Sequence, residues 1–304
     1  QMSRKKIVVI GGGAAGFFGA IRAAEQNPAA EVLLLEKNRT VLNKVRISGG
    51  GRCNVTHACF DDKKLAKFYP RGGSFLKPLF KTFNPQSTID WFQQKGVALK
   101  IESDGRMFPT TDSSETIALC LENEAIRKGV QVKTSTGVSK IHPKEETGFV
   151  LELLDGTNLE VDAVLVTTGG NPNVEGYRWL ADLGLNILKP LPSLFTFNTP
   201  EGVFKDLSGV SVPNANVKIA GRKLKQDGPL LVTHWGFSGP AILKLSAWGA
   251  KELAEVEYKF STLINWCGET TENEVREQWT SQKKLHPKKV IQSNQLLGIP
   301  SRLW

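Results

Sequence analysis

Apolar residues near the N-terminus form two short continuous runs. Residues 7–10 are Ile-Val-Val-Ile and lead directly into Gly11, and a second run covers residues 32–35. An alanine-rich stretch that reaches about residue 26 lies between them. Short continuous apolar runs are typical of buried parallel strands, so this pattern predicts a strand, a helix and a second strand.

The following 130 or so residues alternate between helical and strand-like patterns. Residues 37–52 are expected to form a loop, residues 61–96 helices, and residues 113–128 an amphipathic helix with Ile117 and Leu121 on one face. Short strands are expected at 97–102, 106–108, 130–133, 137–141, 149–153 and 163–166. The N-terminal region is therefore predicted to have an α/β fold.

The composition changes near Pro190. Residues 191–258 contain short β-like pieces separated by Gly, Pro and Asn, and residues 272–304 are helical in pattern and charged. We therefore expect two domains, residues 1–189 and residues 190–304, and the second is expected to be β-rich with a helical tail.

The glycines after the first strand indicate a ligand. Gly11, Gly13 and Gly16 follow the G-x-G-x-x-G pattern, and Glu36 comes about 20 positions later, at the end of the second strand. Gly11 permits a tight turn, Gly13 allows a pyrophosphate to approach the backbone, and Gly16 allows the helix and strand to pack closely. Because Glu36 accepts hydrogen bonds from a ribose and repels a 2′-phosphate, the pattern favours FAD or NAD over NADP. The alternative is that this is a βαβ unit with no ligand.

Composition narrows the class of protein. The chain has 304 residues, 40% of them hydrophobic, and a net charge of +9. A positive balance suits an anionic ligand and permits contact with nucleic acid without requiring it. The four cysteines and four histidines show no metal-type spacing, so we expect no metal site and a reducing, cytoplasmic location. No apolar stretch is long enough to span a membrane.

Cys53 and Cys59 invite comparison with the redox cysteine pairs of flavin disulfide reductases. Five residues separate them here, whereas those enzymes have four. On a helix, a step of six residues rotates the side chain by about 240°, so the two sulfurs would lie on different faces. We therefore expect no catalytic disulfide.

Three further segments resemble a known family. Residues 46–56, Arg-Ile-Ser-Gly-Gly-Gly-Arg-Cys-Asn-Val-Thr, are similar to the I-S-G-G-G-R-C-N signature of bacterial NAD(P)/FAD-dependent oxidoreductases, which include aminoacetone-oxidase-like and bile-acid dehydro-reductase-like members. Residues 164–170 resemble the family's second FAD motif, with Thr167 in place of an alanine. Residues 228–243 resemble its G-x-L-L-x-T-H-x-G-x-S-G-P-A segment.

The resemblance implies a Rossmann-like FAD-binding domain of the two-dinucleotide-binding type with an inserted β-rich domain. It also implies which residues approach the cofactor. Gly50 and Gly51 would expose backbone N–H groups there, and Arg52 would pair with phosphate or stabilise a reduced flavin. The implied cofactor-binding residues are Gly11, Gly13, Ala14, Ala15, Gly16, Glu36, Lys37, Lys44, Arg46, Gly49, Gly50, Gly51, Arg52, Cys53, Asn54, Val138, Thr168, Gly169 and Gly170.

Members of this family usually extend for roughly a hundred residues beyond the segment that corresponds to residues 300–304. The resemblance therefore implies that this chain stops inside the inserted domain, and that residues 1–304 alone would bind FAD more weakly and turn over little. The absence of a second G-x-G-x-x-G unit implies that NAD(P)H, if it is the electron donor, visits the flavin directly.

The function expected from the sequence is FAD-dependent two-electron redox of a small organic substrate: an amine, a ketone or an enone. Two alternatives stay open. One is a basic flavoprotein that binds or modifies RNA, although a nucleic-acid partner is the less favoured reading, and the other is a flavin-binding partner without activity. The residues do not identify a catalytic side chain or an oligomeric state.

Overall fold

The computed structural model describes residues 4–200, 202–293 and 295–304. The chain divides into two compact units, Gln1–Pro190 and Leu191–Trp304.

A four-stranded parallel sheet organises the first unit. Its strand order is β10-β1-β2-β6, so β1 lies beside both β10 and β2. The strands are β1 (Lys6–Ile10), β2 (Glu31–Leu35), β6 (Gln131–Lys133) and β10 (Ala163–Val166). A parallel sheet of this order with a helix between its first two strands confirms the predicted α/β, Rossmann-type fold.

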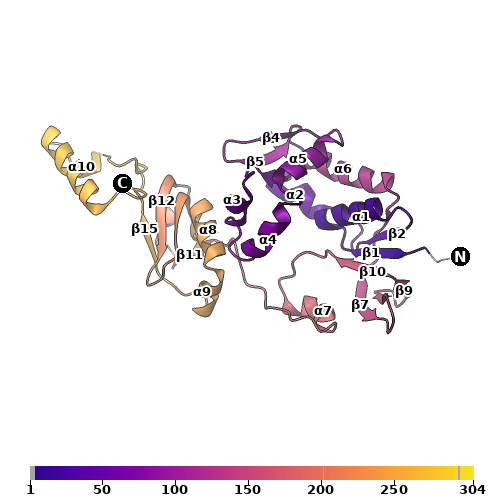
Figure 1. Cartoon of the computed structure of the whole chain (residues 1–304). Helices are drawn as coiled ribbons and strands as arrows, with labels where there is room; N and C mark the ends of the chain where they lie inside the picture. The colour runs from indigo at the N-terminus through magenta and orange to yellow at the C-terminus, as the bar shows by residue number, and fades with distance from the viewer. Residues whose placement is uncertain (1–3, 201, 294) are drawn as a thin grey trace. The chain divides into compact units, whose positions relative to one another are not determined.

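Both faces of this sheet are covered, which explains the continuous apolar runs. Val9 and Leu34 pack among the helices α1 (Ala14–Gln26) and α6 (Ser114–Arg127). The alternate residues, Val8 and Leu33, belong to a second core with the antiparallel strands β7, β8 and β9. Figure 1 shows α1 and β7 on opposite sides of β1. Strands β7, β8 and β9 cover Val138–Pro143, Phe149–Leu153 and Asn158–Val161.

A second group of elements lies between β2 and α6 in the sequence. Three short strands form a sheet of order β3-β5-β4. The bounds of the group are α2 (Asn43–Gly51), β3 (Thr56–His57), α3 (Asp62–Ala66), α4 (Gly73–Phe80), α5 (Pro85–Gln93), β4 (Leu99–Ile101) and β5 (Arg106–Pro109). The first unit ends with the 3₁₀ helix η1 (Val174–Tyr177) and α7 (Arg178–Ala181).

The expected loop at 37–52 is wrong in part. Residues 43–47 begin a helix, and Ser48, Gly49 and Gly50 then leave helical geometry. The three glycines at 49–51 all have positive φ values, so they end the helix in a left-handed turn. The stretch that follows contains β3, so the argument about Cys53 and Cys59 rested on a helix that does not form, although all four cysteines are free in the structure.

The second unit is built on a five-stranded antiparallel sheet of order β11-β14-β13-β12-β15. Apolar residues from this sheet and from α8 form a separate core. The elements are β11 (Phe197–Asn198), η2 (Lys205–Leu207), β12 (Ser211–Ile219), β13 (Lys225–Thr233), β14 (Gly236–Ser238), α8 (Pro240–Trp248), α9 (Ala250–Glu255), β15 (Thr262–Asn265), α10 (Glu272–Leu285) and η3 (Ile291–Ser293). Among the residues of the charged tail that the structure describes, 272–293 and 295–304, the α-helix ends at Leu285 and one 3₁₀ turn follows it, so the helical tail is shorter than expected.

Candidate cofactor site

The glycine turn after β1 is fixed by close backbone contacts. Gly11 has φ +112°, and its N–H donates to the carbonyl of Leu35 at 2.7 Å. A Cβ on Gly11 would lie 2.6 Å from the carbonyl oxygen of Thr167, and a Cβ on Gly16 would lie 1.8 Å from the carbonyl oxygen of Gly11. Side chains at these two positions would therefore collide with the backbone that brings β1, α1 and β10 together.

Gly13 differs from its neighbours because it faces open space. A Cβ there would meet no heavy atom within 4 Å. Gly13 is the N-cap of α1, no side chain caps this end, and the first turn has no acidic residue. The first intrahelical bond of this turn runs from the N–H of Phe17 to the carbonyl of Gly13, which leaves the preceding N–H groups for a ligand. This end of α1 therefore has the donors and the partial positive charge that bind a phosphate group.

Glu36 closes the opposite side of the turn. One carboxylate oxygen accepts from the N–H of Gly12 at 2.8 Å, and the other accepts from the backbone N–H and the side-chain amide of Asn38 at 2.8 and 2.7 Å. The oxygen that Gly12 contacts accepts this one hydrogen bond, so it has a second acceptor site to which a ribose hydroxyl can donate. Glu36 therefore fixes the glycine turn and also presents a carboxylate to the ligand space.

The glycine turn opens into a cavity of about 850 Å³ that lies within the first unit. Its wall runs from Glu36, Lys37 and Val138 past the end of α1 to Asn54. Phe18, Phe92, Leu121 and Trp179 contribute apolar surface. A cavity of this volume with a phosphate site in its wall suits a dinucleotide cofactor.

Most of the sequence-predicted residues come together in this wall. The predicted residues that line the cavity are Gly11, Gly13, Ala14, Ala15, Glu36, Lys37, Lys44, Cys53, Asn54, Val138, Thr168, Gly169 and Gly170. The predicted residues outside the cavity lining are Gly16, Arg46, Gly49, Gly50, Gly51 and Arg52. Gly16 and the glycines at 49–51 therefore shape the backbone around the cavity without forming its wall.

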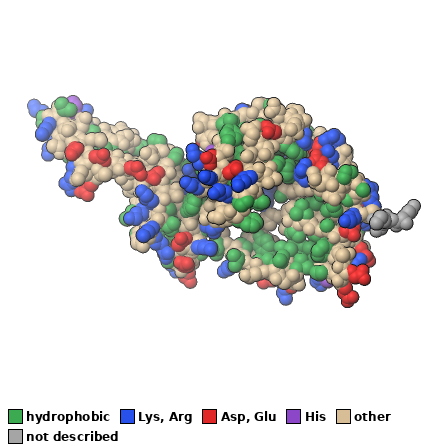
Figure 2. All heavy atoms as spheres, viewed as in Figure 1, with side chains coloured by type: hydrophobic (Ala, Val, Ile, Leu, Met, Phe, Trp, Pro, Cys, Tyr) green, Lys and Arg blue, Asp and Glu red, His purple; other side chains and the backbone are tan. Residues whose placement is uncertain are grey.

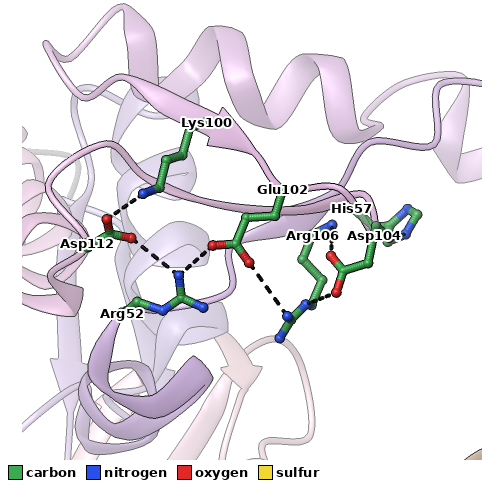
Figure 3. A network of polar contacts seen from close by, with 7 residues as sticks. All are labelled: Arg52, His57, Lys100, Glu102, Asp104, Arg106 and Asp112. Atoms are coloured by element: carbon green, nitrogen blue, oxygen red, sulfur yellow. Dashed lines mark hydrogen bonds and ion pairs between the residues drawn. The ribbon is translucent and has the colours of Figure 1, made fainter. Parts of the chain in front are cut away.

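The guanidinium groups of the two predicted arginines, Arg46 and Arg52, bind carboxylates of this chain. Arg52 pairs with Glu102 at 2.5 Å and Asp112 at 3.4 Å, and it lies 4.0 Å above the ring of Phe108. Figure 3 shows this network continuing from Glu102 to Arg106 and from Asp112 to Lys100. In the structure Arg52 thus stabilises the small sheet rather than facing a phosphate.

Arg46 is held in the same way by a different element. Its guanidinium pairs with Glu115 and, at 2.6 Å, with Glu122, and both glutamates belong to α6. Its carbonyl also accepts a hydrogen bond from the hydroxyl of Ser114 at 2.7 Å. These contacts fasten α2 to α6 and direct the Arg46 side chain to carboxylates of this chain.

Lys44 is the cation that the α2 helix presents to the cavity. A Cβ on Gly169 would lie 3.7 Å from the Lys44 ammonium, which places that ammonium beside the turn after β10. Across residues 4–200, 202–293 and 295–304, no carboxylate forms a salt bridge with Lys44. Its charge is therefore available to an anionic ligand.

We predict that Lys44→Gln weakens FAD binding by at least about tenfold, because one charge-assisted hydrogen bond contributes roughly 1.5–3 kcal/mol. Arg52→Gln removes the same charge from the neighbouring carboxylate network and should change the affinity less than about threefold. Quenching of flavin fluorescence on titration measures both dissociation constants. Equal losses in the two variants would contradict the placement of Lys44.

The turn of glycines at 49–51 brings Cys53 to the cavity. The N–H of Cys53 donates to the carbonyl of Ser48 at 3.0 Å, and Cys53 itself has φ +62°. Its side chain is buried, and burial raises the pKa of the thiol. Because a raised pKa favours the protonated form, Cys53 stays a thiol at neutral pH.

We predict that iodoacetamide at pH 8 modifies Cys53 in the folded protein much more slowly than in the urea-unfolded chain, by at least about tenfold, because only the exposed thiolate reacts. Peptide mass spectrometry over a time course gives both rates. Cys59, which is less buried, serves as the internal comparison. Labelling of Cys53 at the same rate in both states would show that this part of the cavity wall opens readily.

Thr167 and residues that follow Gly170 also belong to the wall of the cavity. The hydroxyl of Thr167 donates to the carbonyls of Ile10 and Gly11 at 2.9 and 3.0 Å, which ties β10 to the glycine turn. Asn171, Tyr177 and Trp179 line the far part of the cavity. The threonine pair before Gly169 was visible as a motif, whereas the residues after Gly170 carry no periodicity that marks them.

Among the residues that the structure describes, no group of three or more His, Cys, Asp or Glu side chains is arranged to hold a metal ion. Within the same residues, no helix has both the length and the apolarity needed to cross a bilayer.

Comparison with known proteins identifies relatives along nearly the whole chain. A ribosomal RNA dihydrouridine synthase of Escherichia coli is 28% identical over 99% of this chain and 73% of its own length. A ribosomal RNA dihydrouridine synthase of Haemophilus influenzae is 26% identical over 97% of this chain and 72% of its own length. A 3-dehydro-bile acid delta(4,6)-reductase of Clostridium scindens is 27% identical over 82% of this chain and 62% of its own length.

These three proteins are longer than this chain, which spans about 62 to 73% of their lengths. The profile of the HI0933-like protein Rossmann domain matches residues 5–291, and so covers both units. The chain therefore belongs to the HI0933-like family of Rossmann-domain flavoproteins, which are FAD-binding oxidoreductases.

Proposed function

We propose that this protein binds FAD in the cavity of the first unit and reduces a carbon–carbon double bond that is conjugated to a carbonyl group. The observation that carries the proposal is the joining of three features in one wall: the open Gly13 cradle, the carboxylate of Glu36 and the ammonium of Lys44. The Gly13 cradle and Lys44 suit an anionic cofactor with a pyrophosphate group, and Glu36 suits its ribose.

The residues present fit FAD. Gly13, Ala14 and Ala15 would bind the pyrophosphate through backbone N–H groups, and Glu36 would accept from the ribose. Lys44, Cys53 and Asn54 also line the cavity, and they would approach the flavin end of the cofactor. When bound, FAD supplies a carrier for two electrons. The protein orients it, and its apolar wall residues exclude water.

The substrate class is inferred from what two kinds of relative share. A dihydrouridine is a uridine whose ring double bond has been reduced, and that bond is conjugated to a carbonyl. A 3-dehydro-bile acid delta(4,6)-reductase is named for ring double bonds of a 3-oxo compound. In each case two electrons and two protons are added across a carbon–carbon bond. Of the amine, ketone and enone classes expected from the sequence, we therefore propose the enone class.

The reductant that we propose is NAD(P)H, which would reduce the flavin directly. The residues described here contain one strand–glycine turn–helix unit of the dinucleotide-binding type, at β1 and α1. A nicotinamide cofactor would therefore approach the flavin in the same cavity that later admits the substrate.

A two-step anaerobic experiment tests this function. The FAD-loaded protein is first mixed with NADH or NADPH, and loss of flavin absorbance reports reduction. Cyclohex-2-enone, or uridine within an oligonucleotide, is then added, and cyclohexanone serves as the saturated control. Reoxidation by an unsaturated compound and not by cyclohexanone is expected. A flavin that these reductants reduce but that neither unsaturated compound reoxidises would overturn the proposed substrate class.

A further inference from the structure

One segment of the first unit combines positive charge with exposed aromatic rings. We call residues 60–83, which contain α3 and α4, the α3–α4 segment. It has six Lys or Arg residues against two Asp residues, and six of its residues are Phe or Tyr. Such a composition differs from an ordinary solvated helix face, which is charged but poor in aromatic residues.

The aromatic rings of this segment are unusually open to solvent. Phe75 is 77% exposed, Phe68 60%, Phe60 50% and Tyr69 41%. Leu65 is its buried anchor, and no residue of α4 is buried. Exposed aromatic rings gathered in one segment indicate an interaction surface, because burying them against a partner removes apolar surface from water.

The lysines of the segment are not neutralised by the rest of the chain. Lys63, Lys64, Lys67, Lys77 and Lys81 are exposed, and in the part of the chain that the structure describes none of them forms a salt bridge. The arginines at 46, 52 and 106 nearby each pair with carboxylates. Figure 2 shows Lys and Arg side chains gathered over the α3 region of this face.

The segment contacts the wall of the cavity at its C-terminal end, and a second ring contact is made from within the segment. At its C-terminal end the ring of Phe83 lies 5.1 Å from the ring of Phe18, and Phe18 lines the cavity. Near its start the ring of Phe68 lies 5.4 Å from that of His57, which belongs to the strand that follows Cys53 and Asn54. A long ligand on this surface would therefore pass beside the cavity.

We propose that the α3–α4 segment binds single-stranded RNA and delivers a uracil base to the cavity. Lysines at 63, 64 and 67 contact phosphates, and the exposed rings stack on neighbouring bases. The positive charge of the lysines favours a polyanion as the partner. The aromatic rings favour unpaired bases over a duplex, because unpaired bases can stack on them. This inference rests on the proposed function, because it names an RNA uracil as the conjugated double bond that is reduced.

Fluorescence anisotropy of the FAD-loaded protein with a labelled 12-nucleotide uridine-rich RNA tests the lysines. The triple variant Lys63→Gln, Lys64→Gln, Lys67→Gln should bind about tenfold more weakly at moderate salt. Its plot of log K against log salt should be shallower by about 2, since each phosphate contact on a single strand contributes about 0.7 to the slope. The control Lys283→Gln, Lys284→Gln, Lys288→Gln removes the same charge from exposed positions in and after α10 and should leave the slope unchanged.

The aromatic contribution is tested separately. Phe75→Ala should weaken RNA binding about tenfold with no change in the salt slope, because stacking involves no counterion release. Ile126→Ala on α6 is the matched control, since Ile126 is 71% exposed and apolar but lies outside the segment. Equal effects of Phe75→Ala and Ile126→Ala would overturn the role given to the rings.

The outcomes separate this inference from the proposed function. Absence of RNA affinity, with reoxidation of the flavin by cyclohex-2-enone intact, overturns the RNA surface and leaves the reductase. Loss of self-association in the lysine or Phe75 variants, measured by sedimentation, with RNA affinity unchanged, would assign the segment to a protein interface instead. RNA binding that falls in both segment variants and in neither control, with enone reoxidation unchanged, supports the inference.

Discussion

The variant Gly13→Asp should lose FAD binding by at least about a hundredfold while the protein itself stays folded. Gly13 faces open space in the cavity, so a side chain is accommodated there without a clash. It is also the N-cap of α1, with an extended backbone conformation that Asp and Asn readily adopt. A carboxylate at this position would accept hydrogen bonds from the free N–H groups of α1 and so cap the helix. It would also exclude the pyrophosphate from those N–H groups by its bulk and repel it by its charge.

A series at this position separates bulk, capping and charge. Gly13→Ala adds one carbon, Gly13→Asn adds nearly the same volume as Asp without the charge, and Gly13→Asp adds both. The expected order of FAD affinity is glycine, alanine, asparagine and aspartate, from tightest to weakest. The thermal midpoint of the cofactor-free protein should stay level or rise for Asn and Asp, because either caps α1.

Isothermal titration gives the affinities, and circular dichroism gives the midpoints. An aspartate variant that binds FAD as tightly as the parent protein would show that the pyrophosphate does not lie at this end of α1. A fall in the thermal midpoint of the cofactor-free protein would instead show that other atoms of the protein occupy the space beside Gly13 when no cofactor is bound.

The glycine turn could be read from sequence because its requirements are local. Gly11, Gly13 and Gly16 follow a strand at fixed spacing, and at each position the lack of a side chain allows other atoms to come close to the backbone. The start of α5 depends on contacts that are equally local: Asn84 caps the helix through the N–H of Ser87, and Pro85 lies in the first turn. Local rules of this kind need no knowledge of distant residues.

The partners of Arg46 and Arg52 could not be read in this way. Arg52 meets Glu102 and Asp112, which are 50 and 60 residues away, and Arg46 meets two glutamates of α6. Which anion an arginine binds depends on the tertiary structure, and a motif shows only that a cation is present. The exposure of the aromatic rings in the α3–α4 segment could not be predicted for a related reason. Apolar positions in a helix predict burial, and only the tertiary packing shows which of them stay exposed.

The variant Gly16→Ala should destabilise the first unit by about 3 kcal/mol or more, a value typical of an overpacked site that cannot relax. The added Cβ would lie 1.8 Å from the carbonyl oxygen of Gly11, and that backbone is held in turn by β2 and Thr167. Relief would require α1 to move away from β1, and the cradle at Gly13 would be distorted with it. FAD affinity and thermal midpoint should therefore fall together, the midpoint by roughly 6–12 °C.

Gly19→Ala in the same helix is the matched control. Its Cβ would lie 2.5 Å from a terminal methyl carbon of Leu165, a side chain that is 41% exposed on the edge strand β10 and free to turn aside. Both substitutions gain the same roughly 1 kcal/mol of helix propensity, so the difference between them isolates the contact with the backbone. Thermal unfolding of the two variants with and without FAD measures it. If Gly16→Ala proves as stable as Gly19→Ala, the close approach of α1 to the glycine turn is wrong, and the cradle at Gly13 must be placed by other contacts.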